Sequence, residues 1–231
     1  MFRNLINETP PTALAGPEER EGKMEKTAPL VITISRQLGA GGAYVGKQLA
    51  KNLSVFYADR EIIDEAAKEL SVLKEDLESH DEKISSFLRS FLLSHAIPPV
   101  ANIPRPISGL SDSKLFKIQS EIIARIAKER SAIIIGRCGS YVLRDNPNHV
   151  SIFLHADMTF RQGRMQKLHD VSEGEAREMI TRSDGEREQY HYKFTGKDWT
   201  DARQYDISMD TGKIGVDKCV ECIMKYLDLI Q

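Results

Sequence analysis

Apolar residues alternate along the chain between two spacings, which together predict an α/β fold. Short runs rich in apolar residues, as expected for strands buried on both faces of a parallel sheet, occur at 30–35, 55–58, 132–136, 149–156 and 205–211. Between these runs, apolar residues recur at every third or fourth position, which is the spacing of one helix face. We therefore expect a three-layer arrangement of about five parallel strands with helices on both faces.

The helical spacing also gives approximate bounds for the helices. They are predicted at 43–53, 59–70, 113–130, 157–170, about 172–183 and 215–230. Asp59 is placed to cap the second of these helices, and Ser111 or Asp112 the third, because short side-chain oxygens accept from the first free backbone N–H groups. The fifth helix is expected to end near Thr181. Residues 71–95 favour two more helical pieces, followed by a proline-rich loop.

Composition narrows the class of protein. With 231 residues, of which 41% are hydrophobic and 29% charged, the chain has the size of one domain, or of one domain with a small inserted lobe. The 32 Lys and Arg residues against 34 Asp and Glu give a net charge of -2, so no overall basic field indicates nucleic-acid binding. No apolar run approaches the roughly 18 residues of a membrane span. Any phosphate-binding site must therefore be local.

The ends of the chain and its cysteines favour a cytoplasmic protein. Residues 1–28 contain several prolines and a charge cluster and predict a disordered tail, without the apolar core of a secretory signal. Cys138, Cys219 and Cys222 are too few for a secreted disulfide framework. Cys219 and Cys222 form a C-x-x-C inside the last predicted helix, where core packing is the better interpretation. No His or Cys spacing indicates a resident metal site.

A glycine-rich turn follows the first predicted strand and opens a helix, an arrangement that is typical of anion sites. Two known patterns fit it only in part. The dinucleotide-binding pattern lacks its third glycine, although Asp59 lies at a suitable distance for a ribose, and it stays a minor alternative. The Walker A pattern fits from Gly41 to Lys47, but Gln48 stands where a magnesium-binding hydroxyl is expected.

A second Walker A register agrees better with the end of the strand. In this register Arg36 replaces the first glycine, and Gly42 and Ala43 stand where a lysine and a hydroxyl residue are usual. The backbone cradle is retained, so the phosphate-binding cation must come from another residue, Arg36 or Lys47. The candidate donor site then comprises Arg36, Gly39, Ala40, Gly41, Gly42, Ala43, Tyr44 and Lys47.

Four blocks of sequence carry a family resemblance. They are ISRQLGAGGAYVGKQLAKNL, FYADREIIDEAA, IIIGRCGSYVL and YHYKFTGKDWTDARQYDISMDT. In this order, over roughly 30–225, they resemble the cytidylate-kinase-like branch of the P-loop nucleoside monophosphate kinases. The resemblance implies a P-loop NTPase fold with a nucleotide-monophosphate lobe at 59–112 and a lid at 182–204. It also implies transfer of a phosphoryl group from ATP, with Mg²⁺, to a nucleoside monophosphate, with CMP or dCMP favoured.

The resemblance assigns roles to charged residues, because phosphoryl transfer depends mainly on charge neutralisation and alignment. The substrate-binding candidates are Asp59, Arg60, Arg137 and Arg161, with Asp64 a weaker one. Arg137 belongs to a Gly-Arg pair that contacts the monophosphate in cytidylate kinases. Arg182 and Arg187 are implied as catalytic phosphate clamps, with Asp184 as an orienting or metal-proximal acid.

Two questions stay open on the sequence alone. Tyr190, Tyr192, Phe194 and Trp199 either stack on a base and close the lid, or pack the lid against the core. The substitutions at Gly42 and Ala43 leave a second hypothesis, that of a catalytically weak or inactive nucleotide-binding regulatory protein. Convergence of the arginines on the glycine loop would favour the kinase. The expected partners are ATP and a nucleoside monophosphate, with neither nucleic acid nor membrane, and the oligomeric state is open.

Overall fold

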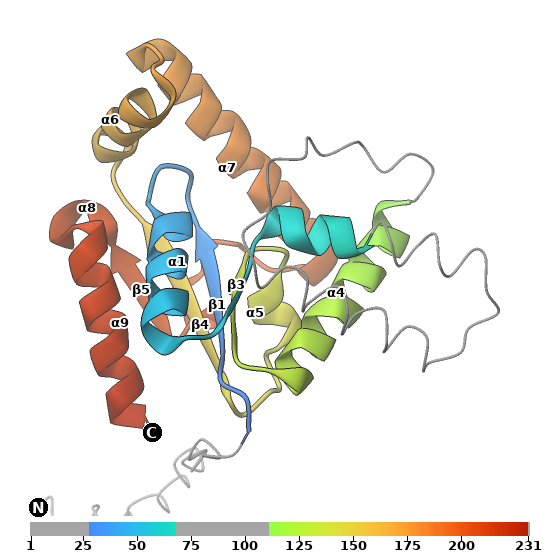
Figure 1. The fold of residues 1–231 in the computed structure, drawn as a ribbon. Helices are drawn as coiled ribbons and strands as arrows, with labels where there is room; N and C mark the ends of the chain where they lie inside the picture. Colours follow the sequence, from blue (N-terminus) through green and yellow to red (C-terminus); the bar gives the residue numbers. More distant parts are fainter. Residues whose placement is uncertain (1–27, 68–110, 231) are drawn as a thin grey trace, which may run out of the picture.

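The structure is a computed structural model, and it describes residues 28–67 and 111–230 (Figure 1). Nearly all of the predicted tail lies outside the described residues. So do the two helical pieces predicted within 71–95, the proline-rich loop after them, and most of the predicted lobe at 59–112.

The described residues confirm the predicted parallel sheet. Its strands are β1 (Val31–Arg36), β2 (Phe56–Ala58), β3 (Ala132–Ile135), β4 (His149–His155) and β5 (Ile207–Asp210). They lie in the order β2-β3-β1-β4-β5, and every pairing is parallel (Figure 1). The central strand β1 therefore ends at the same edge as β3 and β4, which is where open α/β sheets bind their ligands.

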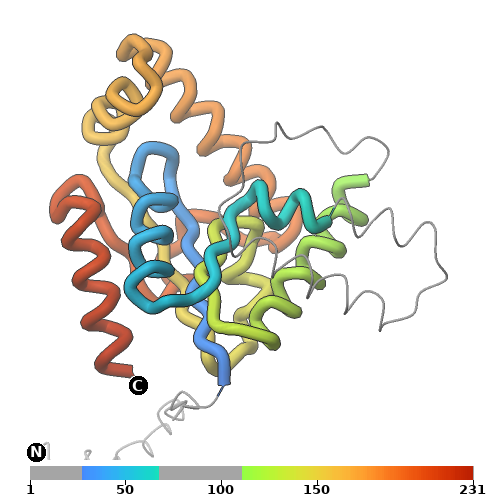
Figure 2. Tube along the Cα trace, viewed as in Figure 1, coloured from blue at the N-terminus to red at the C-terminus, as the bar shows by residue number. Residues whose placement is uncertain are grey.

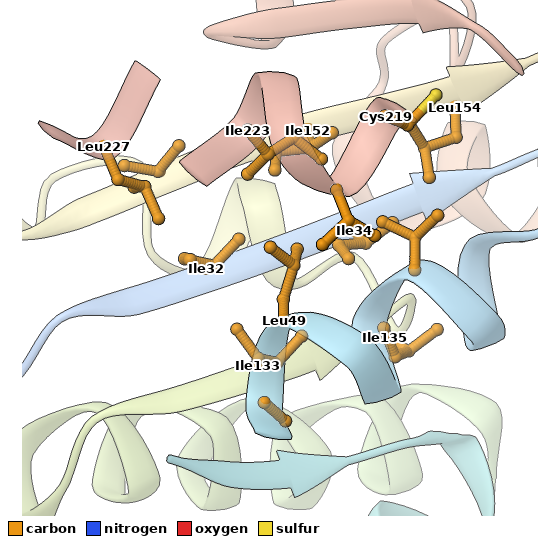
Figure 3. Packing of buried hydrophobic residues seen from close by; sticks show 14 of the residues in the cluster. Ile32, Ile34, Leu49, Ile133, Ile135, Ile152, Leu154, Cys219, Ile223 and Leu227 are labelled. Atoms are coloured by element: carbon orange, nitrogen blue, oxygen red, sulfur yellow. The ribbon is translucent and has the colours of Figure 1, made fainter. Parts of the chain in front are cut away.

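Alternate residues of the strands face two separate cores, which puts helices on both sides of the sheet. On one side, Ile32 and Ile34 pack with α1 (Gly42–Leu53) and α9 (Val216–Ile230). Figure 3 shows Leu49 of α1 and Ile223 of α9 in this cluster. On the other side, Val31 and Ile134 pack with α4 (Asp112–Glu129), the short α5 (Gly139–Val142) and a helix described over 60–67.

The helix caps agree with the sequence. A carboxylate oxygen of Asp59 accepts hydrogen bonds from the backbone N–H groups of Glu61 and Ile62, at 3.1 and 3.2 Å. Ser111, rather than Asp112, caps α4. These caps satisfy N–H groups that have no partner inside the helix.

A helical hairpin extends beyond the sheet edge and corrects one prediction. It consists of α6 (Met158–His169) and α7 (Glu173–Thr195), and a capping box at Ser172 starts the second helix (Figure 1). The prediction that this helix ends near Thr181 was wrong. Gly185 weakens a helix by only about 1 kcal/mol, and the residue before it is fixed by ion pairs described below. Gly196 ends the helix instead, at φ +67°.

Short elements complete the chain between the hairpin and the last helix. A 3-10 turn, η1 (Ala202–Gln204), precedes β5, and α8 (Thr211–Ile214) follows it. Trp199 of the predicted lid and Tyr205, which directly follows the lid, lie beside β4 and are buried against Phe153. The region between α7 and β5 is therefore anchored on the sheet.

Stability should depend on pH through His149 in β4. Burial lowers the pKa of His149 to about 4, and its Nε2 lies 2.7 Å from the hydroxyl of Thr33. The unfolded chain takes up this proton near pH 6.5, whereas the folded chain stays neutral until about pH 4. The stability that neutral His149 contributes is therefore fully present above pH 6.5, and it is lost as the pH falls towards about 4.

Between about pH 7 and about pH 5, we expect the wild type to lose about 2 kcal/mol more unfolding free energy than the variant His149→Gln. Urea unfolding at the two pH values measures this difference. His169→Gln, at an exposed position in the last turn of α6, is the control. Equal losses in the wild type and His149→Gln would contradict the prediction.

Candidate active site

A tight loop of residues 37–41 joins β1 to α1 and lies beneath the α6–α7 hairpin (Figure 2). Gly39 and Gly41 have φ values of +84° and +82°, which other residues rarely adopt. A Cβ atom on Gly39 would lie 2.8 Å from the Cβ of Arg161 and 2.9 Å from its carbonyl oxygen. The loop therefore needs glycine both for its turn and for its close contact with α6.

The loop presents free backbone N–H groups at the start of α1. Within the described residues, no acceptor is found for the N–H groups of Gly39, Gly41, Gly42, Ala43 and Tyr44. In the register in which Arg36 takes the place of the first Walker glycine, the position of the usual lysine is Gly42, which is the first residue of α1. Free N–H groups at a helix N-terminus form a ready site for a phosphate.

Asp184 of α7 is the common acceptor that joins the loop to the hairpin. It accepts a hydrogen bond of 2.8 Å from the backbone N–H of Leu38, and its carboxylate is also ion-paired with Arg161 and Arg187. Arg161 in turn donates to the carbonyl of Leu38, and Arg187 to the carbonyl of Arg36. Asp184 therefore orients Arg161, a predicted substrate-binding residue, and Arg187, a predicted phosphate clamp, and it holds the loop against them.

The side chain of Arg36 packs against two glycines, Gly42 at the start of α1 and Gly136 after β3. A Cβ on Gly42 would lie 2.6 Å from its Cγ, and a Cβ on Gly136 would collide with its guanidinium group. Among the described residues, no carboxylate forms an ion pair with Arg36. Burial and the charge of Arg187 lower the pKa of Arg36 to about 10.

A pocket of about 200 Å³ lies beside the loop and is rich in arginine. Its lining includes four arginines, Arg36, Arg60, Arg137 and Arg187, against one carboxylate, Glu186. Ile135 and the rings of Tyr190, His191 and Trp199 form further parts of its walls. Such an excess of positive charge in a partly buried pocket favours an anionic ligand.

Arg137 reaches this pocket from a turn with an uncommon backbone. After β3, Gly136, Arg137 and Cys138 all have positive φ values, of +76°, +53° and +53°. Residues other than glycine adopt these backbone angles at a cost in free energy, and residues with such angles cluster at functional sites. The guanidinium of Arg137 is ion-paired with Asp64 and lies 5.3 Å from the centroid of the Tyr190 ring.

The remaining predicted site residues lie around this centre. Asp59 caps the helix that carries Arg60, and Arg60 is 67% exposed at the pocket rim, 3.5 Å from Asp64. Arg182 is exposed and lines a separate hollow with Leu38 and Met179. Arg187 and Arg137 thus line the same pocket, whereas Arg182 does not line it.

Three further residues from the predicted donor site have other surroundings. Ala40 is fully buried in the core below the loop. The hydroxyl of Tyr44 donates to Asp217 of α9 at 2.6 Å. Lys47 is exposed in the second turn of α1, and its ammonium lies 5.7 Å from the ring centroid of Tyr57. Arg36 is therefore better placed than Lys47 to supply the cation of the pocket.

The predicted aromatic cluster is divided between two places. Phe194 stacks on Phe116 of α4 with centroids 4.2 Å apart, and Tyr190 meets both rings edge-on. Tyr192 is 66% exposed. Trp199 packs in the separate cluster on β4. Most of these rings therefore pack the structure, and Tyr190 and Trp199 also line the pocket.

Residues 31–213 match the family model described as the cytidylate kinase-like family. The chain belongs to this family. The cytidylate kinase of Sulfurisphaera tokodaii is 24% identical over 210 residues, which cover 87% of this chain and 97% of that protein. The cytidylate kinase of Saccharolobus islandicus is 27% identical over 128 residues, 54% of this chain and 61% of that protein.

A solved structure supports the fold of this cytidylate kinase-like chain. An uncharacterized protein from Eubacterium ventriosum superposes with a TM-score of 0.65 at 27% identity, covering 87% of this chain and 99% of that one. Within the described residues, no helix is both long and apolar enough to cross a bilayer. The family and its relatives support phosphoryl transfer that involves a nucleotide, which is the activity of a kinase in the broad sense.

Membership of a cytidylate kinase-like family implies the use of ATP and Mg²⁺. The described residues suit the phosphates of ATP better than they suit the metal. Phosphates fit the free N–H groups of the loop. The buried Nε atoms of Arg161 and Arg164 also lack a hydrogen-bond partner among the described residues. For the metal, Ala43 supplies no hydroxyl, and the described ranges contain no group of three or more Asp, Glu, His or Cys residues that could hold a metal ion. Mg²⁺ does not need such a group, because it is commonly bound through phosphates, waters and one or two carboxylates.

Two residues near the site are not among the predicted site residues, although the sequence places one of them, Arg164, on the same helix face as Arg161. Arg164 lies one turn after Arg161, and its Nη2 is 3.6 Å from the position of a Cβ on Gly41. Its spacing gave a signal, since positions i and i+3 share a helix face. Gln119 gave none, because a single polar residue in an apolar stripe is common, and its partners Asp64 and Tyr190 come from distant segments of the chain.

Proposed function

We propose that this protein transfers the γ-phosphoryl group of ATP to a nucleoside monophosphate, with CMP or dCMP as the favoured acceptor. The observation that carries the proposal is the convergence of Arg36, Arg137 and Arg187 on one pocket beside the free N–H groups of the glycine loop. The choice of acceptor rests on the similarity to cytidylate kinases.

The geometry suggests a division of labour between loop and pocket. The N–H groups at the start of α1 would bind the phosphates of the donor. Arg137 and Arg60, on the side of β2 and β3, would bind the monophosphate of the acceptor. Arg36 and Arg187 lie between the loop and these residues. Arg36 is the last residue of β1, directly before the loop, and Arg187 donates a hydrogen bond to the carbonyl of Arg36. They would contact the phosphoryl group in transit.

Arginines suit this role better than a single lysine would. In phosphoryl transfer, negative charge is spread over several oxygens, and a planar guanidinium can bind two of them at once. The usual P-loop lysine and hydroxyl are absent at Gly42 and Ala43. In this chain Arg36, preorganised by its packing over Gly42 and Gly136, would supply the missing charge.

An assay of ADP release with Mg-ATP and a panel of nucleoside monophosphates tests the proposal. We expect turnover with CMP or dCMP above the other monophosphates. ATP binding without any stimulating acceptor would instead support the second hypothesis, a nucleotide-binding regulatory protein. Failure to bind ATP would mean that the loop is not the donor site.

In the same assay, Arg137→Ala should lower kcat/KM by about 30-fold, mainly through a higher KM for the acceptor. The reason is the loss of a charge-assisted hydrogen bond to phosphate, worth about 2 kcal/mol. Arg203→Ala is the matched control, because that arginine is 90% exposed and pairs only with Asp201 among the described residues. An unchanged acceptor KM in Arg137→Ala would contradict the assignment of this residue.

A further inference from the structure

Arg137 is held by a closed ring of side chains from four parts of the fold. Asp64 accepts from Nη2 of Arg137 with one carboxylate oxygen, and with the other it accepts from Nε2 of Gln119 at 2.8 Å. Oε1 of Gln119 accepts from the hydroxyl of Tyr190, also at 2.8 Å. The aromatic face of Tyr190 then meets the guanidinium of Arg137 and closes the ring.

Gln119 occupies a position that is costly for an amide. It is fully buried on α4, beside Ile118, Ile122 and Ile123. A buried amide lowers stability unless both of its ends are hydrogen-bonded. The Asp64 carboxylate can only accept, so the amide must turn its NH2 group there and leave its oxygen for the Tyr190 hydroxyl. The direction of each hydrogen bond in the ring is therefore fixed.

The ring determines where the guanidinium of Arg137 points. The residue starts from a left-handed backbone, and its buried Nε has no partner among the described residues. Its described partners are Asp64 and Tyr190, and Arg60 also lies 3.5 Å from the same Asp64 oxygen. Without Gln119 and the Tyr190 hydroxyl, the carboxylate would be free to turn towards the exposed Arg60.

We propose that Gln119 and Tyr190 are positioning residues, which act through Asp64 to keep Arg137 oriented for the phosphate of the acceptor. This inference rests on the proposed function for the identity of the acceptor. It goes beyond that function by assigning part of acceptor affinity to a buried amide and a hydroxyl that need not touch the acceptor.

Two variants break the ring without removing its bulk. Tyr190→Phe keeps the aromatic face under Arg137 and removes only the hydroxyl. Gln119→Met keeps an unbranched side chain and removes both hydrogen bonds. Tyr192→Phe removes a hydroxyl from an exposed position of the same helix and is the control.

Steady-state kinetics should separate positioning from a structural role. For Tyr190→Phe and Gln119→Met we expect the acceptor KM to rise about fivefold to tenfold, as for the loss of one hydrogen bond. The KM for ATP and kcat should stay within about twofold, and Tyr192→Phe should match the wild type. The double variant should be little worse than either single variant, because both break one chain. An unchanged acceptor KM, or equal changes in both KM values with a lowered Tm, would overturn the inference.

A titration with inorganic phosphate distinguishes this inference from the proposed function. Isothermal titration, made with a non-hydrolysable ATP analogue present to occupy the glycine loop, should show phosphate binding that is lost in Arg137→Ala and weakened about fivefold to tenfold in Tyr190→Phe and Gln119→Met. If no monophosphate is phosphorylated but this pattern holds, the proposed function fails and the positioning role stands. If phosphate binds equally to the wild type and both ring variants, the positioning role fails, whatever the activity.

Discussion

Replacing Arg36 by methionine is expected to lower kcat/KM by about a thousandfold without lowering the free energy of unfolding. Loss of one preorganised charge at a transferred phosphoryl group costs two to three orders of magnitude or more in comparable sites. Methionine keeps the apolar stem that packs over Gly42. The change therefore removes mainly the charge.

The expected stability of this variant follows from the surroundings of Arg36. Arg187, Arg137 and Arg60 all act to lower the pKa of Arg36, and the described residues offer it no ion-paired carboxylate. A buried charge with like-charged neighbours destabilises the folded protein. Its removal should leave the free energy of unfolding unchanged or raise it, which is typical of residues kept for activity at the expense of stability.

Urea unfolding and the ADP-release assay, made on the same preparations, test both halves of this prediction. Inorganic phosphate should also raise the Tm of the wild type more than that of Arg36→Met, since binding to the folded state stabilises it. Arg203→Met is the control for loss of an exposed arginine. A variant that loses activity and stability together would show that Arg36 has a structural role instead.

Asp184→Asn is expected to lower the free energy of unfolding by about 3 kcal/mol and activity by about a hundredfold. The amide has nearly the same shape, but it cannot balance the charge of Arg161, whose side chain is 7% exposed. A buried guanidinium without its carboxylate is strongly destabilising. The loop should also lose its anchor, because Asp184 accepts from the N–H of Leu38.

Hydrogen exchange, together with urea unfolding, checks this second prediction. The amide of Leu38 should exchange faster in Asp184→Asn than in the wild type. Asp145→Asn breaks an exposed ion pair with Arg144 and should leave both measurements unchanged. Wild-type stability in Asp184→Asn would mean that Arg161 does not depend on this carboxylate.

The sheet and most helices were predictable because their signals are local. Ile32 and Ile34 belong to a short β-branched run that is typical of a buried strand, and the stripe of Val45 and Leu49 indicates the inner face of α1. The helix α7 was cut short in the prediction because Ser183-Asp184-Gly185 resembles a break. Its continuation depends on ion pairs of Asp184 with residues whose proximity the sequence does not reveal.

The site was predictable in its residue types and less so in its arrangement. The glycine loop and the Gly136-Arg137 pair could be identified, because strand ends and glycine spacing indicate them. The choice between Arg36 and Lys47 could not be made, since it depends on Arg36 crossing Gly136, a residue 100 positions later. The role of Gln119 could not be predicted for the same reason, because its partners Asp64 and Tyr190 come from two other helices.

Helix α7 contributes to both halves of the site from one continuous backbone. Asp184 touches the donor loop, and six residues later Tyr190 touches the ring around Arg137, a separation of about 9 Å along the helix axis. The helix therefore sets the distance between the two proposed phosphate positions. Inserting or deleting one residue between them would turn one contact by about 100° relative to the other. Apart from Arg187, the residues of this stretch can be substituted, but the number of residues in it is constrained.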